Sequence, residues 1–187
     1  MKICLYGAGS RNIRDEYKKT GYQLGCEIAR RGHSLIFGGG GTGMMGAVSK
    51  GVNDNNGRTV GIAPKWMDDF EGISDECDRF IKTEAMDDRK RLFAEVSDAF
   101  IITPGGIGTL DEIFEIITLK KLHLHNKPIV IFNMNHFYDK MLEMVDFMIS
   151  ENTIPESNRN LFEVCYTVEE TLDYIEGYNE IMNKQAE

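Results

Sequence analysis

One glycine-rich turn constrains the fold of this chain more than any other feature. Residues 99–103 form an apolar run typical of a buried strand, and apolar positions from residue 110 onward recur at helical spacing. Gly105, Gly106 and Gly108 lie between the two segments. The unpaired N–H groups and the macrodipole of a helix start favour a bound phosphate, and glycines let a ligand approach the backbone closely. The turn therefore predicts an α/β fold with a phosphate site.

The same turn has a simpler interpretation as a helix cap. Thr109 and Glu112 fit a capping box, in which the threonine caps the helix and the glutamate reaches back three residues. An acid in the first turn also suits the helix dipole. A plain cap does not need three glycines in four positions, so the glycines favour a ligand site, with Glu112 either an active group or a cap.

Strand and helix patterns alternate along the chain. Strands are predicted at residues 2–6, 34–37, 59–63, 79–83, 99–103, 128–132 and 161–166. Helices are predicted at residues 15–31, from within 38–46 to about 55, at 86–96, after 108, at 136–150 and at 168–182, with 64–78 as a loop or lid. This order predicts a three-layer, Rossmann-like α/β fold, with a mostly parallel sheet and helices on both faces. The glycine turns after Tyr6, Phe37 and Thr103 would then share the carboxyl edge of the sheet and line one crevice.

Length and composition predict a single domain over residues 1–187, with a polar tail at 183–187 that frays. The net charge of −9 argues against a nucleic-acid partner, since such partners usually require a basic surface. No apolar run is long enough to span a bilayer, and the N-terminus has no signal-peptide layout. A cytoplasmic protein without a membrane partner is therefore expected.

Neither a metal nor a cofactor is expected. The four cysteines form no C-x-x-C pair, and the four histidines have no metal-ligand spacing. Residues 41–46 match the dinucleotide fingerprint, but the next strand ends at Ala63-Pro64 without the acid that would hold a ribose. No Gly-Lys-Ser/Thr follows a glycine turn, and no lysine has a convincing pyridoxal phosphate context. Close packing explains Gly43 and Gly46 at least as well as ligand contact.

A charged cluster, residues 86–91, begins the helix before the central strand. Such runs are usually solvated helix faces. Arg89, however, lies just upstream of the strand that leads to Pro104, and its guanidinium could reach a phosphate or ribose oxygen. Arg89 and Glu112 are therefore the candidate active groups of a protein that binds a phosphorylated small molecule.

Two motifs together resemble the Lonely Guy family of cytokinin riboside 5′-monophosphate phosphoribohydrolases and related nucleotide nucleosidases. Residues 104–112, Pro-Gly-Gly-Ile-Gly-Thr-Leu-Asp-Glu, are similar to its P-G-G-x-G-T-x-x-E signature, and residues 86–90 to its M-x-x-R-K signature. The likeness continues through the glycines of residues 38–46 and from residue 2 to beyond 147. Asp87 replaces a frequent histidine and Ile107 a frequent tyrosine, changes that leave the base specificity open.

The resemblance implies hydrolysis of the N-glycosidic bond of a nucleoside 5′-monophosphate, such as AMP or a cytokinin riboside 5′-monophosphate. Arg89 would clamp the phosphate or ribose, and Glu112 would stabilise an oxocarbenium-like transition state. The resemblance also implies a homodimer that shares the site. The expected substrate-binding residues are Glu71, Met86, Lys90, Gly105, Gly106, Ile107, Gly108, Thr109 and Thr118.

Two alternatives come from other functional classes. One is a non-catalytic carrier of a phosphorylated ligand, similar to the molybdenum-cofactor carrier proteins, which would bind tightly without turnover. The other is a single-stranded DNA-binding relative of the same fold, which the net charge of −9 disfavours. The presence of both Arg89 and Glu112 favours the enzyme.

Overall fold

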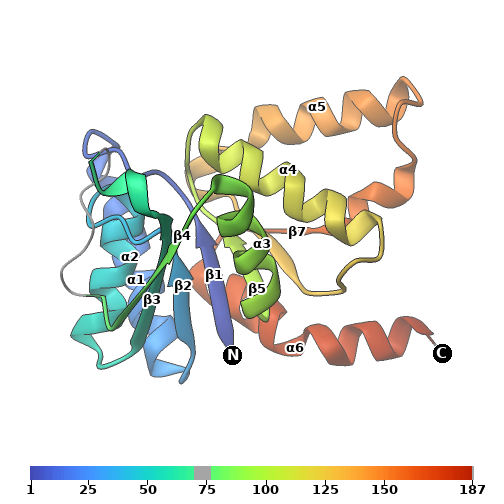
Figure 1. The fold of residues 1–187 in the computed structure, drawn as a ribbon. Helices are drawn as coiled ribbons and strands as arrows, with labels where there is room; N and C mark the ends of the chain where they lie inside the picture. Colours follow the sequence, from blue (N-terminus) through green and yellow to red (C-terminus); the bar gives the residue numbers. More distant parts are fainter. Residues whose placement is uncertain (70–76, 187) are drawn as a thin grey trace.

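The computed structural model describes residues 1–69 and 77–186, and it confirms the alternation of strands and helices (Figure 1). The strands are β1 (Lys2–Tyr6), β2 (Ser34–Phe37), β3 (Arg58–Pro64), β4 (Arg79–Thr83), β5 (Ala99–Ile102), β6 (Ile129–Phe132) and β7 (Glu163–Cys165). The α-helices are α1 (Asp15–Arg30), α2 (Gly43–Asp54), α3 (Met86–Val96), α4 (Ile107–Lys121), α5 (Asp139–Ser150) and α6 (Val168–Ala186).

The strands pair in parallel in the order β4-β3-β2-β1-β5-β6-β7. One hydrophobic core lies between the sheet and α1, α2 and α6, and a second lies between the sheet and α3, α4 and α5. The predicted three-layer Rossmann-like fold is thus confirmed. The strand order reverses between β1 and β5, which is where folds of this class bind ligands.

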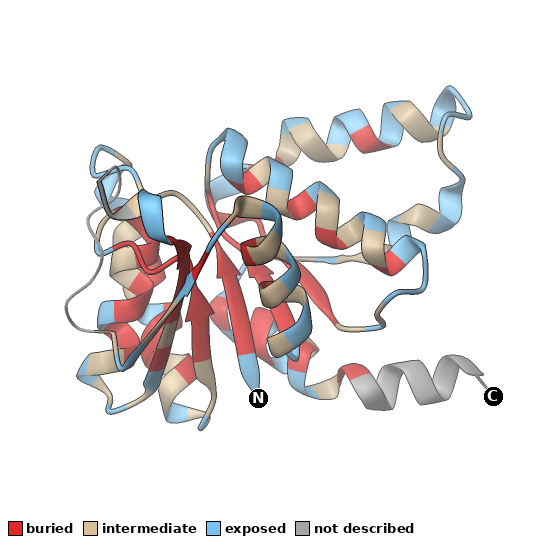
Figure 2. Ribbon diagram, viewed as in Figure 1, coloured by how far each residue is buried: buried red, intermediate tan, exposed pale blue. Residues whose placement is uncertain are grey.

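Strands β5 and β6 are buried along their whole length because helices cover both faces of the sheet (Figure 2). Every residue of β5 and β6 is buried, and both strands are short apolar runs, as expected for a parallel sheet. Such strands form a rigid base for the turns at their carboxyl ends.

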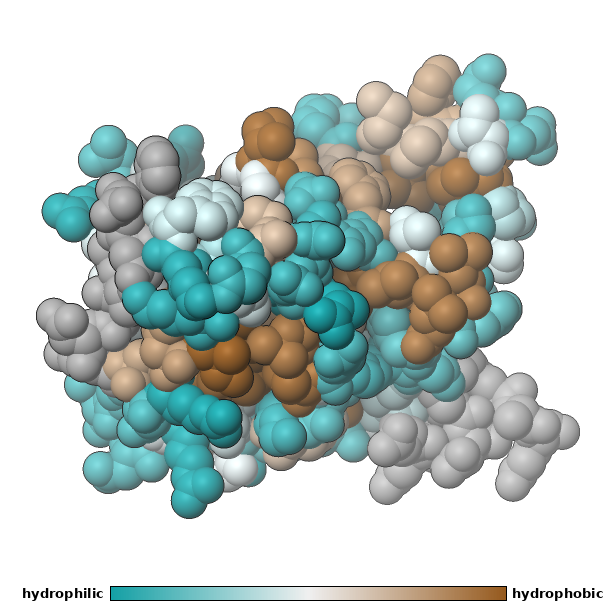
Figure 3. Space-filling view, in the orientation of Figure 1, coloured by the Kyte–Doolittle hydropathy of each residue, from teal (hydrophilic) through white to brown (hydrophobic). Residues whose placement is uncertain are grey.

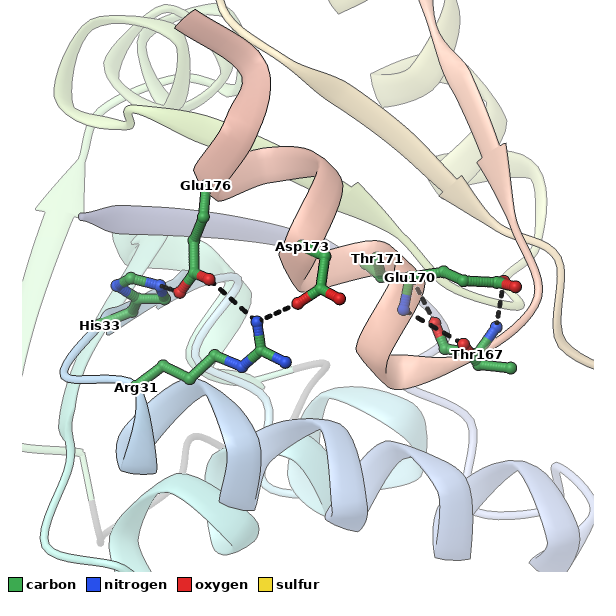
Figure 4. A network of polar contacts seen from close by, with 7 residues as sticks. All are labelled: Arg31, His33, Thr167, Glu170, Thr171, Asp173 and Glu176. Atoms are coloured by element: carbon green, nitrogen blue, oxygen red, sulfur yellow. Dashed lines mark hydrogen bonds and ion pairs between the residues drawn. The ribbon is translucent and has the colours of Figure 1, made fainter. Parts of the chain in front are cut away.

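Helix α6 is fixed to the end of α1 by a polar network (Figure 4). Arg31 Nη1 donates to Asp173 Oδ1 at 2.6 Å and to Glu176 Oε2 at 2.9 Å, while His33 Nε2 lies 2.7 Å from Glu176 Oε1. A capping box also starts α6, because Glu170 N donates to Thr167 Oγ1 and the Glu170 carboxylate accepts from Thr167 N.

Several element boundaries differ from the prediction. The predicted loop at 64–78 begins with a 3₁₀ turn at Lys65–Asp69, and β3 continues through Pro64. The predicted helix at 136–150 is a 3₁₀ turn at Met134–His136 followed by α5, because Asn135 and His136 adopt left-handed backbone conformations that interrupt a helix. The last strand is shorter than predicted, and α6 extends past residue 182 to Ala186. Within the described ranges no helix is long and apolar enough to cross a membrane.

Candidate active site

The three glycine turns meet at the carboxyl edge of the sheet, as predicted. Ala8 N donates to Pro104 O at 3.1 Å, which joins the turn after β1 to the turn after β5. Thr42 Oγ1 donates to Gly9 O at 2.6 Å and Met44 N donates to Ala8 O at 2.8 Å, which joins the turn after β1 to the start of α2. These turns therefore form one continuous backbone surface at the place where the strand order reverses.

Glycines have two different roles in these turns. A Cβ on Gly43 would lie 2.5 Å from Ala8 O, and one on Gly46 would lie 2.4 Å from Gly41 O, so close packing explains both residues. Gly106 and Gly108 are different, because a Cβ on either would meet no atom within 4 Å. Packing within the protein does not require these two glycines, and they leave the start of α4 open to a ligand.

A cavity of about 280 Å³ lies over this surface. Among the described residues that line it, Arg89 is the only cation and Glu112 the only acid. Its walls come from all three glycine turns, from α3 and from α4. The lining residues are Leu5, Gly7, Ala8, Gly9, Ser10, Gly38, Met45, Arg89, Gly106, Gly108, Thr109 and Glu112.

Arg89, in the first turn of α3, is buried and held on several sides. Its Nε donates to Ile62 O at 3.0 Å, and its guanidinium carbon lies 5.1 Å from the centre of the Phe93 ring. A Cβ on Gly38 would lie only 2.4 Å from Arg89 Nη2, so the glycine makes room for the guanidinium. The charge is thus fixed in place at the cavity wall.

Glu112 forms an ion pair with Arg89 at the cavity wall. Arg89 Nη1 and Glu112 Oε1 are 3.4 Å apart, and the side chains are 8% and 11% exposed. Helix α4 begins at Ile107 with Gly106 at the N-cap and no side-chain cap, so Thr109 lies inside the first turn. The capping-box interpretation of Thr109 and Glu112 is therefore wrong, because the helix starts before Thr109.

The groups beneath the site are neutral. Burial raises the pKa of Cys4, Tyr6 and Tyr138, and the negative charge of Glu112 raises each of them further. Arg89 and Glu112 are therefore the only ionised side chains among the described residues of the cavity wall. No group of three metal-binding side chains occurs among residues 1–69 and 77–186.

Some residues predicted to bind substrate lie outside this cavity wall. Lys90 forms ion pairs with Asp111, at 3.2 Å, and with Glu115, so it joins α3 to α4. Thr118 donates to Phe114 O at 2.6 Å. Met86, Gly105 and Ile107 are near the site in sequence without lining the cavity. Glu71 falls outside the described residues. Of the predicted set, the structure brings together Arg89, Gly106, Gly108, Thr109 and Glu112.

The sequence did not indicate which residues of the other two glycine turns line the cavity. Ser10 and Gly9 after β1, with Gly38 and Met45 around the second turn, also line the cavity. The signal was present, because both turns follow apolar strands and were expected to border the same crevice. The sequence alone does not show which of their side chains point inward.

Comparison with known proteins agrees with this geometry. A family model described as "Possible lysine decarboxylase" matches residues 45–175. The cytokinin riboside 5′-monophosphate phosphoribohydrolase LOG of Oryza sativa subsp. japonica is 34% identical over 177 residues, which cover 95% of this chain and 73% of the rice protein. LOG3 of Arabidopsis thaliana, another cytokinin riboside 5′-monophosphate phosphoribohydrolase, is 33% identical over 95% of this chain and 82% of its own length. The chain belongs to the Lonely Guy family.

Solved structures place this Lonely Guy family member among proteins of the same fold. The molybdenum cofactor binding protein of Rippkaea orientalis superposes with a TM-score of 0.70 at 25% identity, covering 95% of this chain and 94% of that one. The molybdenum cofactor carrier protein of Chlamydomonas reinhardtii has a TM-score of 0.71 at 24% identity, covering 94% of this chain and 95% of the carrier, and shows the shared fold alone.

Proposed function

We propose that this protein hydrolyses the N-glycosidic bond of a nucleoside 5′-monophosphate and releases a free base and ribose 5-phosphate. The observation that carries the proposal is the buried Arg89–Glu112 ion pair in the same cavity as the open start of α4. A phosphate site alone suits many proteins, whereas a phosphate site beside a fixed carboxylate suits cleavage at a sugar carbon. The names of the rice and Arabidopsis relatives support the same reaction.

Each group has a distinct task in this proposal. The amides at the start of α4, around Gly106, Gly108 and Thr109, bind the 5′-phosphate, and the helix dipole favours its charge. Glu112, six residues into α4, stabilises the positive charge that develops on the ribose as the bond to the base breaks. Arg89 fixes the Glu112 carboxylate and offers its guanidinium to the phosphate or ribose oxygens. Water is the nucleophile that completes the hydrolysis.

AMP and its N6-modified cytokinin relatives are the substrates we propose. Substrate-binding roles for Glu71, Met86, Lys90, Gly105, Ile107 and Thr118 stay predictions.

The test is a panel of nucleotides with a matched control that lacks phosphate. The purified protein is incubated with AMP, isopentenyl-AMP, GMP and CMP, and with adenosine, and the free base is measured by chromatography. Base release from AMP or isopentenyl-AMP is expected, with a much lower kcat/KM for adenosine because the phosphate site is then unused. No release of base from any monophosphate would overturn the proposal.

We also propose a homodimer. Figure 3 shows apolar surface over the first turn of α4 and over the loop after its end. Ile107 and Phe114 on α4 are 83% and 44% exposed, and Met144 and Phe147 on α5 are 56% and 58% exposed. Exposed apolar residues that gather into one contiguous patch mark association surfaces. Light scattering should give twice the chain mass, and Phe114→Asp should lower it to that of one chain; a wild-type monomer would contradict the proposal.

A cytoplasmic location is part of the same proposal. The four cysteines are free, and Cys4, Cys26 and Cys165 are buried, as suits a reducing compartment that contains nucleotides. Fractionation of cells followed by detection of the protein would test it.

A non-catalytic carrier is the second candidate, and the likeness to the Rippkaea molybdenum cofactor binding protein favours it. This candidate predicts that a phosphorylated ligand raises the unfolding temperature while no monophosphate releases its base. The nucleotide panel therefore separates the two candidates.

A further inference from the structure

Tyr138 lies directly beneath the turn that precedes α4. Its hydroxyl donates to Thr103 O at 2.8 Å and accepts a hydrogen bond from the Gly105 backbone. The residue is 2% exposed and does not line the cavity. One hydroxyl thus contacts the backbone on both sides of Pro104.

The Thr103 carbonyl needs such a donor. Its residue follows the last paired position of β5, since Ile102 pairs with Tyr6 on one side and Ile131 on the other. Thr103 N and Thr103 Oγ1 both donate to Tyr6 O, at 2.9 Å each, so only the carbonyl remains to be satisfied. A buried carbonyl without a partner is costly, which makes the Tyr138 hydroxyl part of the turn's structure.

Tyr138 is itself held rigidly against the sheet. Its backbone N donates to Asn133 Oδ1 at 2.7 Å, and Asn133 Nδ2 donates to Asp139 Oδ1 at 2.8 Å. Asn133 is fully buried, and its backbone N donates to Cys165 O at 2.8 Å. The hydroxyl is therefore fixed relative to the ends of β6 and β7.

We propose that Tyr138 is a positioning residue for the 5′-phosphate. Its hydroxyl sets the conformation of the turn at 103–105, and that turn aims the first amides of α4 into the cavity. The proposal rests on the proposed function for the identity of the ligand, and its geometry rests on the contacts above. Burial and the nearby Glu112 charge raise the pKa of Tyr138, so the hydroxyl stays protonated and donates at neutral pH.

The test compares Tyr138→Phe with a matched control, Tyr178→Phe. Tyr178 is also buried, at 4% exposure, and its hydroxyl donates to Asn126 Oδ1 at 3.3 Å, away from the cavity. Calorimetry measures binding of ribose 5-phosphate to the full chain, and kinetics give kcat and KM for AMP. Circular dichroism establishes that both variants are folded.

Loss of one buried hydrogen bond that orients the site should weaken ribose 5-phosphate binding about tenfold in Tyr138→Phe. The KM for AMP should rise by a similar factor with kcat nearly unchanged, because the lost interaction concerns binding rather than the reacting bond. Tyr178→Phe should bind and turn over as the wild type does. A role confined to stability would lower the unfolding temperature of both variants and leave both affinities unchanged.

The outcomes separate this inference from the proposed function. Equal affinity of Tyr138→Phe and wild type for ribose 5-phosphate would overturn the positioning role, whatever the enzyme does with AMP. Weaker binding in Tyr138→Phe, with no base release from any monophosphate by the wild type, would support the positioning role and refute the hydrolase. A wild type that binds neither AMP nor ribose 5-phosphate would overturn both.

Discussion

Arg89 Nη1 lies 3.4 Å from Glu112 Oε1, and this ion pair joins α3 to α4 at the wall of the cavity. Both side chains are almost fully buried, so each charge has lost most of its hydration. The desolvation penalty of such a pair can exceed its Coulombic gain, which makes stability a poor explanation for its presence. Preorganised charge beside a helix N-terminus is, however, what a charged transition state needs.

The first prediction concerns the Glu112 carboxylate. Glu112→Gln keeps the shape of the side chain and removes its charge, so kcat for AMP should fall about a hundredfold to a thousandfold. The unfolding temperature should also fall, because Arg89 becomes a buried charge without a counter-ion. Rates of base release and thermal unfolding measure the two effects.

Glu115→Gln is the matched control for this change. Glu115 lies on the same helix and pairs with Lys90 outside the cavity, so its loss should leave kcat near that of the wild type. Near-normal turnover in folded Glu112→Gln would show that the pair has only a structural role.

The second prediction concerns Gly38, whose added Cβ would lie 2.4 Å from Arg89 Nη2. Gly38→Ala should push the guanidinium aside and lower kcat/KM by roughly a hundredfold, because an error of about 1 Å in a fixed group can cost that much. The fold should survive, because the atom in the way is the end of a long side chain. Gly177→Ala in α6, where a Cβ meets nothing within 4 Å, is the control and should be fully active. Equal activity of the two variants would contradict the prediction.

The third prediction separates ligand binding from folding at Gly108. A Cβ at this position meets no protein atom within 4 Å, so Gly108→Ala should stabilise α4 by about 0.5–1 kcal/mol. The same methyl group would enter the space proposed for the 5′-phosphate, and kcat/KM for AMP should fall at least tenfold. Thermal unfolding and steady-state kinetics, measured on one preparation, test the expected gain in stability and the expected loss of kcat/KM. A more stable variant with unchanged kcat/KM would show that the phosphate does not bind at this turn.

Two identical sequence patterns show how far the sequence could predict this site. Thr109–Glu112 and Thr167–Glu170 both have the spacing of a capping box, yet only the second forms one. The difference is tertiary: Glu112 lies opposite Arg89, a residue of another helix. The alternation of strand and helix patterns along the chain predicted the parallel sheet. It also predicted that the glycine turns meet, because strand ends in a parallel sheet share an edge.

Side-chain direction within a motif was less predictable. Arg89 and Lys90 are neighbours in sequence, but successive residues on a helix point about 100° apart. Arg89 therefore faces the cavity, whereas Lys90 pairs with Asp111 and Glu115 on α4. The motif spacing identified the helix that carries the charge, and only the packing of α3 against α4 assigned each side chain its partner.

The last prediction concerns Lys120, whose Nζ is buried, donates no hydrogen bond within the described part of the chain and lies 4.8 Å from the centre of the Tyr178 ring. Burial lowers the pKa of Lys120 from 10.5 to about 8. The unfolded chain therefore binds more protons than the folded one between pH 8 and 10.5, so this residue's contribution to stability rises with pH across that window. Below pH 8 the full cost of a buried charge is present, about 3 kcal/mol before the ring contact offsets part of it.

Lys120→Met should accordingly be more stable than the wild type at pH 7, by about 1–2 kcal/mol after the lost ring contact is included. This advantage should shrink as the pH rises from 8 to 10, since the buried lysine is then neutral and the free-energy cost of losing its proton falls as the pH approaches 10.5, the pKa in the unfolded chain. Denaturant unfolding of both proteins at pH 7, 8.5 and 10 measures the difference. Lys121→Met, one residue further and exposed, is the control and should show no such trend. A stability difference for Lys120→Met that stays constant across the three pH values would show that Lys120 is not held as a buried charge.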